Sequence, residues 1–99
     1  MARTENRLTV LGSKRNVQSF RNGDWERPLR AQYCELIENS HKRFSCQFVT
    51  ESPPLESLRK LSGRWPRLIF LLDYETEARR TKGLAKARAG LLEHHQIRY

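Results

Sequence analysis

Apolar and polar residues alternate in two separate stretches of the chain. In NRLTVLG, residues 6–12, Leu8 and Val10 alternate with polar neighbours. In RFSCQFVT, residues 43–50, every second position from Phe44 to Phe48 is apolar. A period of two is typical of a strand with one buried face. The pattern therefore predicts two half-buried strands.

A short helix is predicted after the first strand, which Gly12 ends. Ser13 can accept a hydrogen bond from a free N–H of the first turn. Val17 and Phe20 are three residues apart and share one face. The Asn22-Gly23 pair is a common helix stop, so the helix is expected to end there.

A second helix is predicted within SPPLESLRKLSG, residues 52–63. Ser52 is the candidate N-cap and Pro53 the first helical residue, where its missing N–H has no consequence. Gly63 is expected to end the helix in a left-handed conformation, and Pro66 prevents its resumption. The apolar face carries Leu55, Leu58 and Leu61.

The next stretch, RLIFLLDYE, is apolar at every position from Leu68 to Leu72. A strand that is apolar on both faces is typical of the centre of a sheet. Ile69 and Leu71 would face away from the side that carries Phe70 and its neighbours.

The tail from Arg79 to Tyr99 allows two interpretations. Small residues from Gly83 to Ala89 alternate with larger ones, which indicates a strand, a turn near Gly90 and a last strand. A helix over Thr76–Leu92 remains the alternative, because Ala, Leu, Lys and Arg all favour helices. We adopt the two strands.

The segment Asp24–Lys42 stays unassigned, since Tyr33–Ile37 fits a short strand or a helical turn equally well. The other elements predict one α+β domain over residues 1–99. In a ferredoxin-like arrangement, two helices would cover one face of a mostly antiparallel sheet of four to five strands.

Three stretches, NRLTVLG, SPPLESLRKLSGRWPRLIFLLDYE and KGLAKARAG, together resemble the ferredoxin-like domain of YubB-like proteins. That family occurs mostly on plasmids, phages and other mobile elements and has no established activity. The resemblance implies the fold and no function. The positions that carry it are Asn6, Leu8, Val10, Gly12, Ser52, Pro53, Pro54, Leu61, Ser62, Trp65, Pro66, Phe70, Leu72, Tyr74, Glu75 and Gly83.

Composition narrows the classes of function. The chain has 99 residues, of which 37% are hydrophobic and 30% are charged. It contains no apolar run long enough to cross a bilayer, and its first residues do not have the pattern of a signal peptide. We therefore expect a cytoplasmic protein that makes no membrane contact and whose two cysteines are reduced. The net charge of +8 favours an anionic partner, nucleic acid or an acidic protein.

Neither metal binding nor nucleophilic catalysis has a convincing residue pattern. Cys34 and Cys46 are too far apart for a zinc pair, and adjacent histidines on a strand point to opposite faces. Cys46 with His41 or His95 would form a nucleophilic pair, but Cys46 belongs to an apolar row, where a thiol is inert. The potential zinc ligands are Cys34, His41, Cys46, His94 and His95.

Acid–base chemistry is the remaining catalytic option. Asp73, Glu75 and Glu77 lie near a basic cluster, but local ion pairs at a charged turn are the better explanation of this pattern. We expect no catalytic activity, no cofactor and no metal.

Two binding hypotheses follow. If the tail is extended, four of its basic residues share one sheet face with Arg7, and this cationic face would contact nucleic acid or another polyanion. The competing interpretation is a solvated charged surface. The four tail residues are Arg80, Lys82, Lys86 and Arg88.

The second hypothesis is protein interaction through Ile69 and Leu71. If both helices cover the other face, these two side chains need a homodimer partner or another protein. Alternatively, the tail or the segment Asp24–Lys42 folds over them.

Overall fold

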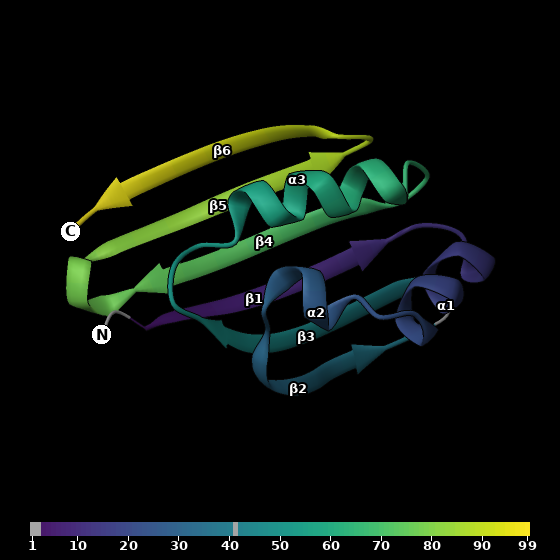
Figure 1. Cartoon of the computed structure of the whole chain (residues 1–99), viewed down its shortest axis with the longest axis horizontal. Coiled ribbons are helices and arrows are strands. Elements are labelled where there is room, and N and C mark those ends of the chain that lie inside the picture. Colours follow the sequence, from purple (N-terminus) through teal and green to yellow (C-terminus); the bar gives the residue numbers. More distant parts are fainter. Residues whose placement is uncertain (1–2, 41) are drawn as a thin grey trace.

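Six strands and a layer of helices make up the part of the chain that the computed structural model describes, residues 3–40 and 42–99 (Figure 1). The strands are β1 (Thr4–Leu11), β2 (Gln32–Asn39), β3 (Arg43–Thr50), β4 (Ile69–Thr76), β5 (Thr81–Arg88) and β6 (Leu91–Arg98). The helices are α1 (Lys14–Asn22), α2 (Glu26–Leu29), α3 (Leu55–Arg64) and the 3-10 helix η1 (Glu77–Arg79). The predicted α+β class is confirmed.

The strands form one antiparallel sheet in the order β2-β3-β1-β4-β5-β6. α1 and α2 connect β1 to β2, which lie on either side of β3 in the sheet. α3 connects β3 to β4, which lie on either side of β1. Two β-α-β units therefore interleave. The β5–β6 hairpin extends the sheet beyond β4, so the prediction of four to five strands was too low.

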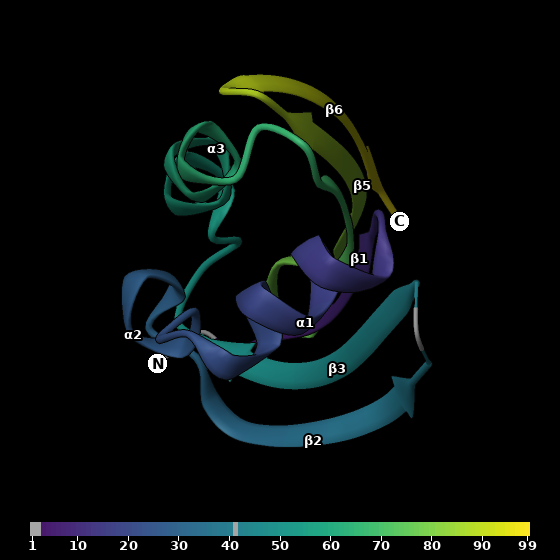
Figure 2. The ribbon, with the colours of Figure 1, turned by 90° about the vertical axis from the view of Figure 1, so that its right-hand side faces the viewer.

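The helices α1, α2 and α3 all lie on the concave side of the sheet, as Figure 2 shows. The inward side chains of the central strands are fully buried beneath them, among them Leu8, Phe70 and Leu72. α3 contributes Leu58 and Leu61 to this core, as predicted. Burial of each such side chain stabilises the fold by about 1.5–3 kcal/mol.

Aromatic rings fill the space between α1 and the sheet. The ring of Phe20 lies 5.3 Å from that of Phe70 and 5.5 Å from that of Trp65, both edge to face. Trp25 continues the cluster, with its ring centroid 5.5 Å from that of Phe44. Edge-to-face pairs add about 0.5–1.5 kcal/mol beyond the area they bury. These contacts anchor the segment that leads into α2.

The predicted ends of α1 are confirmed. The hydroxyl of Ser13 accepts a hydrogen bond from the backbone N–H of Asn16, at 3.3 Å. The helix ends at Asn22, and the N–H of Gly23 donates to the carbonyl of Phe20 at 3.0 Å. Gly23 itself has extended backbone angles, so no left-handed residue is needed here.

The predicted ends of α3 were wrong. The helix begins at Leu55 with Pro54 as its N-cap, because Ser52 lies in the preceding loop, where its carbonyl accepts a 2.7 Å hydrogen bond from the hydroxyl of Thr50. Gly63 does not end the helix, which continues to Arg64.

Gly63 packs against the β5–β6 turn and leaves room for a methyl group there. A Cβ atom placed on Gly63 would lie 3.8 Å from the Cα of Gly90. The N–H of Gly90 donates to the hydroxyl of Ser62 at 3.0 Å. The helix therefore continues past Gly63 because it is held against the hairpin.

The unassigned segment Asp24–Lys42 contains both a helical turn and a strand. α2 is a single turn that ends at Arg30 in the left-handed conformation (φ 54°). β2 then pairs with β3 at the edge of the sheet, with two register shifts. All of its residues are exposed, so no burial period marks it in the sequence.

The tail is extended, as predicted, and the helical alternative is excluded. β5 and β6 are joined by Ala89 and Gly90, which both have positive φ angles, 49° and 83°. Such a two-residue turn matches the twist of a hairpin. Ala85 and Ala87 are small because they lie beneath the helix layer, where they are buried.

Candidate functional site

The convex side of the sheet is not covered by any helix within residues 3–40 and 42–99 (Figures 1 and 2). The tail continues this sheet, and Asp24–Lys42 supplies α2 and β2, so neither segment folds over Ile69 and Leu71, which stay partly exposed. We call this side the open face. Its residues are Arg3, Glu5, Arg7, Thr9, Leu11, Glu35, Glu38, Arg43, Ser45, Gln47, Val49, Ile69, Leu71, Asp73, Glu75, Lys82, Leu84, Lys86, Arg88, Leu91, Glu93, His95 and Ile97.

The open face gathers all but one of the predicted cationic residues. Lys82, Lys86 and Arg88 alternate along β5, and Arg7 lies two strands away on β1. Arg80 does not join them, because it ends η1 in the left-handed conformation (φ 53°) before β5 begins. The prediction that Arg80 shares this strand face was therefore wrong.

Carboxylates from neighbouring strands lie beside these basic groups. Lys82 contacts Glu75 at 4.0 Å. Arg7 lies directly opposite Asp73 in the sheet register, and Lys86 lies opposite Glu93. Sequence reasoning noted Asp73 and Glu75 near a basic cluster but did not place them on the sheet face that carries Lys82 and Lys86. The open face carries the bases Arg3, Arg7, Arg43, Lys82, Lys86 and Arg88 and the acids Glu5, Glu35, Glu38, Asp73, Glu75 and Glu93.

Apolar side chains are the other feature of the open face. Leu84, Leu91 and Ile97 on the β5–β6 hairpin are 61%, 77% and 65% exposed. Leu84 and Leu71 line a shallow hollow of about 440 Å³. Exposed apolar clusters within a polar rim are typical of interaction surfaces.

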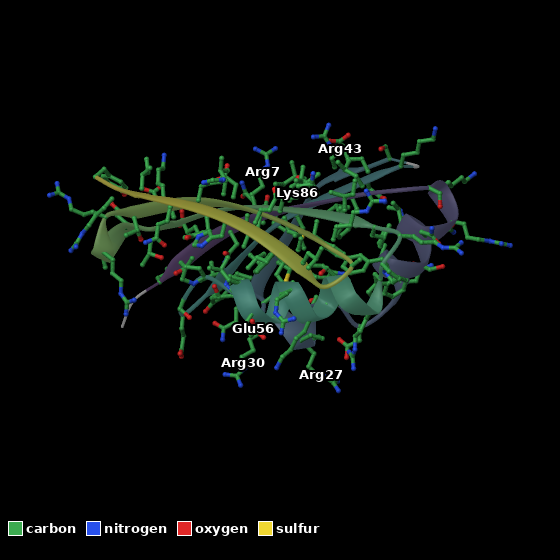
Figure 3. The ribbon with its side chains drawn as sticks, turned by 90° about the horizontal axis from the view of Figure 1, so that it is seen from above. Arg7, Arg27, Arg30, Arg43, Glu56 and Lys86 are labelled. Carbon is green, nitrogen blue, oxygen red and sulfur yellow. The ribbon has the colours of Figure 1, made fainter. Side chains whose placement is uncertain are left out.

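The positive charge of the protein concentrates on the opposite side. Figure 3 shows Arg27 and Arg30 on the helix side, and Arg7, Arg43 and Lys86 on the open face. The segments that form the helix layer, residues 12–31 and 51–67, contain nine basic and four acidic residues. The basic ones are Lys14, Arg15, Arg21, Arg27, Arg30, Arg59, Lys60, Arg64 and Arg67, and the acidic ones are Asp24, Glu26, Glu51 and Glu56.

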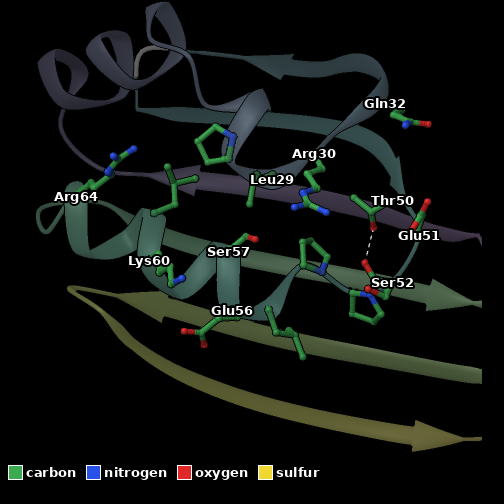
Figure 4. A pocket seen from close by; sticks show the side chains of 15 residues that line it. Leu29, Arg30, Gln32, Thr50, Glu51, Ser52, Glu56, Ser57, Lys60 and Arg64 are labelled. Atoms are coloured by element: carbon green, nitrogen blue, oxygen red, sulfur yellow. Dashed lines mark hydrogen bonds between the residues drawn. The ribbon is translucent and has the colours of Figure 1, made fainter.

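A groove of about 670 Å³ separates α2 from α3 (Figure 4). Arg30 reaches into it from the end of α2, and Lys60 and Arg64 line it from α3. Hydroxyl groups of Ser52 and Ser57 also face the groove. We call this feature the α2–α3 groove. Sequence analysis missed it, because α2 was not predicted.

The thiol groups are not activated. Burial, followed by the neighbouring Cys34 and Glu26, raises the pKa of Cys46 to about 12. Partial desolvation, followed by the carboxylate of Glu26, raises the pKa of Cys34 to about 11. A thiolate, the nucleophilic form, is therefore scarce at neutral pH at both positions.

The other candidate chemistries also lack assembled sites. Among residues 3–40 and 42–99, no three His, Cys, Asp or Glu side chains cluster as a metal site. His94 hydrogen-bonds the hydroxyl of Tyr74 on the helix side, whereas His95 lies on the open face. His41 lies outside the described residues.

The carboxylates considered for acid–base catalysis are engaged in local contacts. Glu75 accepts a hydrogen bond from the hydroxyl of Tyr99 and contacts Lys82. Asp73 lies opposite Arg7, and Glu77 begins η1. The arrangement corresponds to charged turns and cross-strand pairs, which stabilise a protein by about 0–1 kcal/mol each.

Comparisons with protein-family models, with curated proteins and with solved structures found no match to this chain. Along the described part of the chain, the helices are too short and too polar to traverse a bilayer.

Proposed function

We propose that this protein is a non-catalytic interaction module whose open face binds a second copy of the chain in a two-fold dimer. The observation that carries the proposal is the exposure of Leu84, Leu91 and Ile97 on the same sheet face as the uncovered Ile69 and Leu71. Five apolar side chains on one sheet face lose contact with water when another sheet packs on them.

The fold supports this assignment. We propose that β1 to β4, with α1 and α3, form a ferredoxin-like unit of two interleaved β-α-β elements, in keeping with the resemblance to YubB-like proteins. The β5–β6 hairpin would then be an addition to that unit. It supplies three of the five apolar side chains, so the addition enlarges the surface available for docking.

The distribution of charge favours a second copy over an unrelated partner. The half of the open face near the start of β1 carries three bases, Arg3, Arg7 and Lys82, against the four acids Glu5, Glu35, Asp73 and Glu75. The other half carries three bases, Arg43, Lys86 and Arg88, against Glu38 and Glu93. A two-fold axis that runs across the strands places the acidic half of one copy on the basic half of the other.

The same charges argue against nucleic acid on the open face. Six carboxylates lie among six basic groups, so a phosphate backbone would meet repulsion as often as attraction. Sheet-face binding of a polyanion therefore has less support than self-association.

The test is the molecular mass in solution, followed by light scattering or sedimentation across a wide range of concentration. We expect the mass to rise from 11.7 kDa toward twice that value. Leu84→Lys should shift the equilibrium to monomer, because a residue in a two-fold interface is lost twice. Burying the exposed 61% of Leu84 contributes about 1–2 kcal/mol per copy, so the dissociation constant should rise roughly 30- to 700-fold.

Leu36→Lys is the matched control. Leu36 is 55% exposed, but it pairs with the buried Cys46 and so faces the helix side at the sheet edge. The control should dimerise as the unaltered chain does. A monomer at every concentration, or equal weakening by both substitutions, would refute docking through the open face.

A further inference from the structure

We propose a second binding site, independent of dimer formation: the α2–α3 groove binds single-stranded nucleic acid. Phosphates would lie along Arg30, Lys60 and Arg64, and a base would stack on Trp65 beyond them. A single strand needs a cationic path for its backbone and an aromatic surface for its bases, and the helix layer provides both.

The three cations are available to a ligand. Within residues 3–40 and 42–99, no carboxylate lies within 4.0 Å of the charged groups of Arg30, Lys60 or Arg64. The neighbouring bases are engaged, Arg27 with Asp24 at 3.3 Å and Arg59 with Glu56. The groove therefore contains three cations that form no ion pair in the described part of the chain, although Lys60 lies in the field of Glu56.

Two acids also line the groove, and their positions limit their effect. Glu56 is held by Arg59 from the same helix, which keeps the pKa of its carboxyl below the usual range. Glu51 lies in the loop that precedes α3 and is exposed to solvent, where its charge is screened. Glu56, Lys60 and Arg64 all line the groove from α3, and Arg30 lines it from the end of α2 (Figure 4).

The path continues past the groove. Leu61 and Arg64 line both the groove and a second hollow of about 450 Å³, whose walls include Trp25 and Trp65. Trp65 is partly exposed, while its ring packs against that of Phe20 at 5.5 Å. An aromatic ring held in place beside a cation is suited to a stacked base.

The size and shape of the α2–α3 groove favour a single strand of nucleic acid over an isolated phosphate ion. Lys60 and Arg64 are four residues apart on α3, so they lie one above the other about 6 Å along its axis. Arg30 faces them from the opposite wall (Figure 4). The groove of about 670 Å³ and the adjoining hollow of about 450 Å³ together exceed the space that one phosphate group fills. Arg64 lines both, so the cations of the groove adjoin the tryptophan of the hollow.

The test uses fluorescence anisotropy of a labelled oligo(dT) and the quenching of tryptophan emission. Three phosphate contacts predict that the logarithm of the binding constant falls with the logarithm of salt at a slope of about −2, roughly a 16-fold loss between 50 and 200 mM salt. Lys60→Gln combined with Arg64→Gln should weaken binding at least about tenfold and reduce the slope to about −0.7.

Lys14→Gln combined with Arg15→Gln is the matched control. It removes the same net charge from α1, outside both the groove and the open face, and binding should stay within about twofold of the unaltered chain. Circular dichroism checks that both double variants are folded. Equal loss in the two variants would show attraction by net charge alone and would overturn the proposal, as would the absence of any binding at low salt.

A competition experiment separates a strand from a small anion. Inorganic phosphate at an ionic strength matched with chloride should not displace the oligonucleotide, and tryptophan quenching should require the oligonucleotide. Displacement by phosphate alone would assign the groove to a small anion instead. The dimer test uses neither ligand nor these residues, so each proposal can fail without the other.

Discussion

The contact between Tyr74 and Gly83 allows the sharpest prediction about stability. The two residues are directly opposite in the β4–β5 register, and the tyrosine ring lies over the glycine. A Cβ atom on Gly83 would lie 2.2 Å from the Cζ of Tyr74 and 2.3 Å from its Cε2 and hydroxyl oxygen. Ordinary contacts of this kind are 3.4–4 Å. Gly83→Ala therefore cannot be accommodated without moving the ring by more than an ångström.

The size of the effect follows from what the ring would lose. Overpacking of this kind destabilises a core by about 1–3 kcal/mol. The hydroxyl of Tyr74 donates a 2.7 Å hydrogen bond to Gln96 and hydrogen-bonds His94, and each such bond contributes about 1 kcal/mol. Replacing glycine by alanine also lowers the entropy of the unfolded chain, which offsets the loss of stability by about 0.4–1 kcal/mol. We expect Gly83→Ala to lower the free energy of unfolding by roughly 2–4 kcal/mol.

A double-mutant cycle isolates the clash. In a Tyr74→Leu background the ring atoms are gone, so Gly83→Ala should be neutral or stabilise by up to about 1 kcal/mol. Urea unfolding followed by tryptophan fluorescence and circular dichroism measures all four proteins. If Gly83→Ala changes the stability of the unaltered chain and of the Tyr74→Leu variant equally, the ring does not depend on the glycine and the reasoning fails.

Two further predictions concern the thiols and the other glycines. At pH 8, Cys34 should react with a disulfide reagent roughly tenfold more slowly than a free thiol, and Cys46 only after unfolding. Both thiols have a higher pKa in the folded than in the unfolded chain, so the folded chain binds more protons between about pH 9 and pH 12. The free energy of unfolding should therefore fall as the pH rises through this range, and a free energy that does not change with pH would contradict this. Gly90→Ala should destabilise by about 1 kcal/mol, because φ is +83°. Gly63 lies inside α3 and has room for a methyl group, so Gly63→Ala should stabilise the protein by up to about 1 kcal/mol. Thermal unfolding measures both variants, and a Gly90→Ala variant more stable than the Gly63→Ala variant would contradict this.

Burial explains which elements could be predicted. Each half-buried strand has a period of two, and the apolar stripe of α3 has a helical period, because one side of each element faces the core. The tail followed the same rule. Its small inward residues, Ala85 and Ala87, alternate with exposed ones, and this pattern excluded a helix despite high helix propensity. These predictions used only the local periodicity of the chain.

The remaining errors arose where contacts distant in sequence decide the outcome. β2 is exposed along its whole length and is a strand because β3 is beside it. The helix α3 continues past Gly63 because Gly90 and Ser62 hold it against the hairpin. Neither cause leaves a pattern in the neighbouring residues.

The candidate surfaces divide in the same way. By itself the sequence determined that Lys82, Lys86 and Arg88 project from one side of an extended strand, since alternation is a property of the strand alone. Only the tertiary structure decided that carboxylates of β4 and β6 lie beside Lys82 and Lys86, and that Arg30 meets α3 across a groove. Electrostatic potential depends on distance in space, and residues far apart in the chain become neighbours only when the sheet and the helix layer assemble.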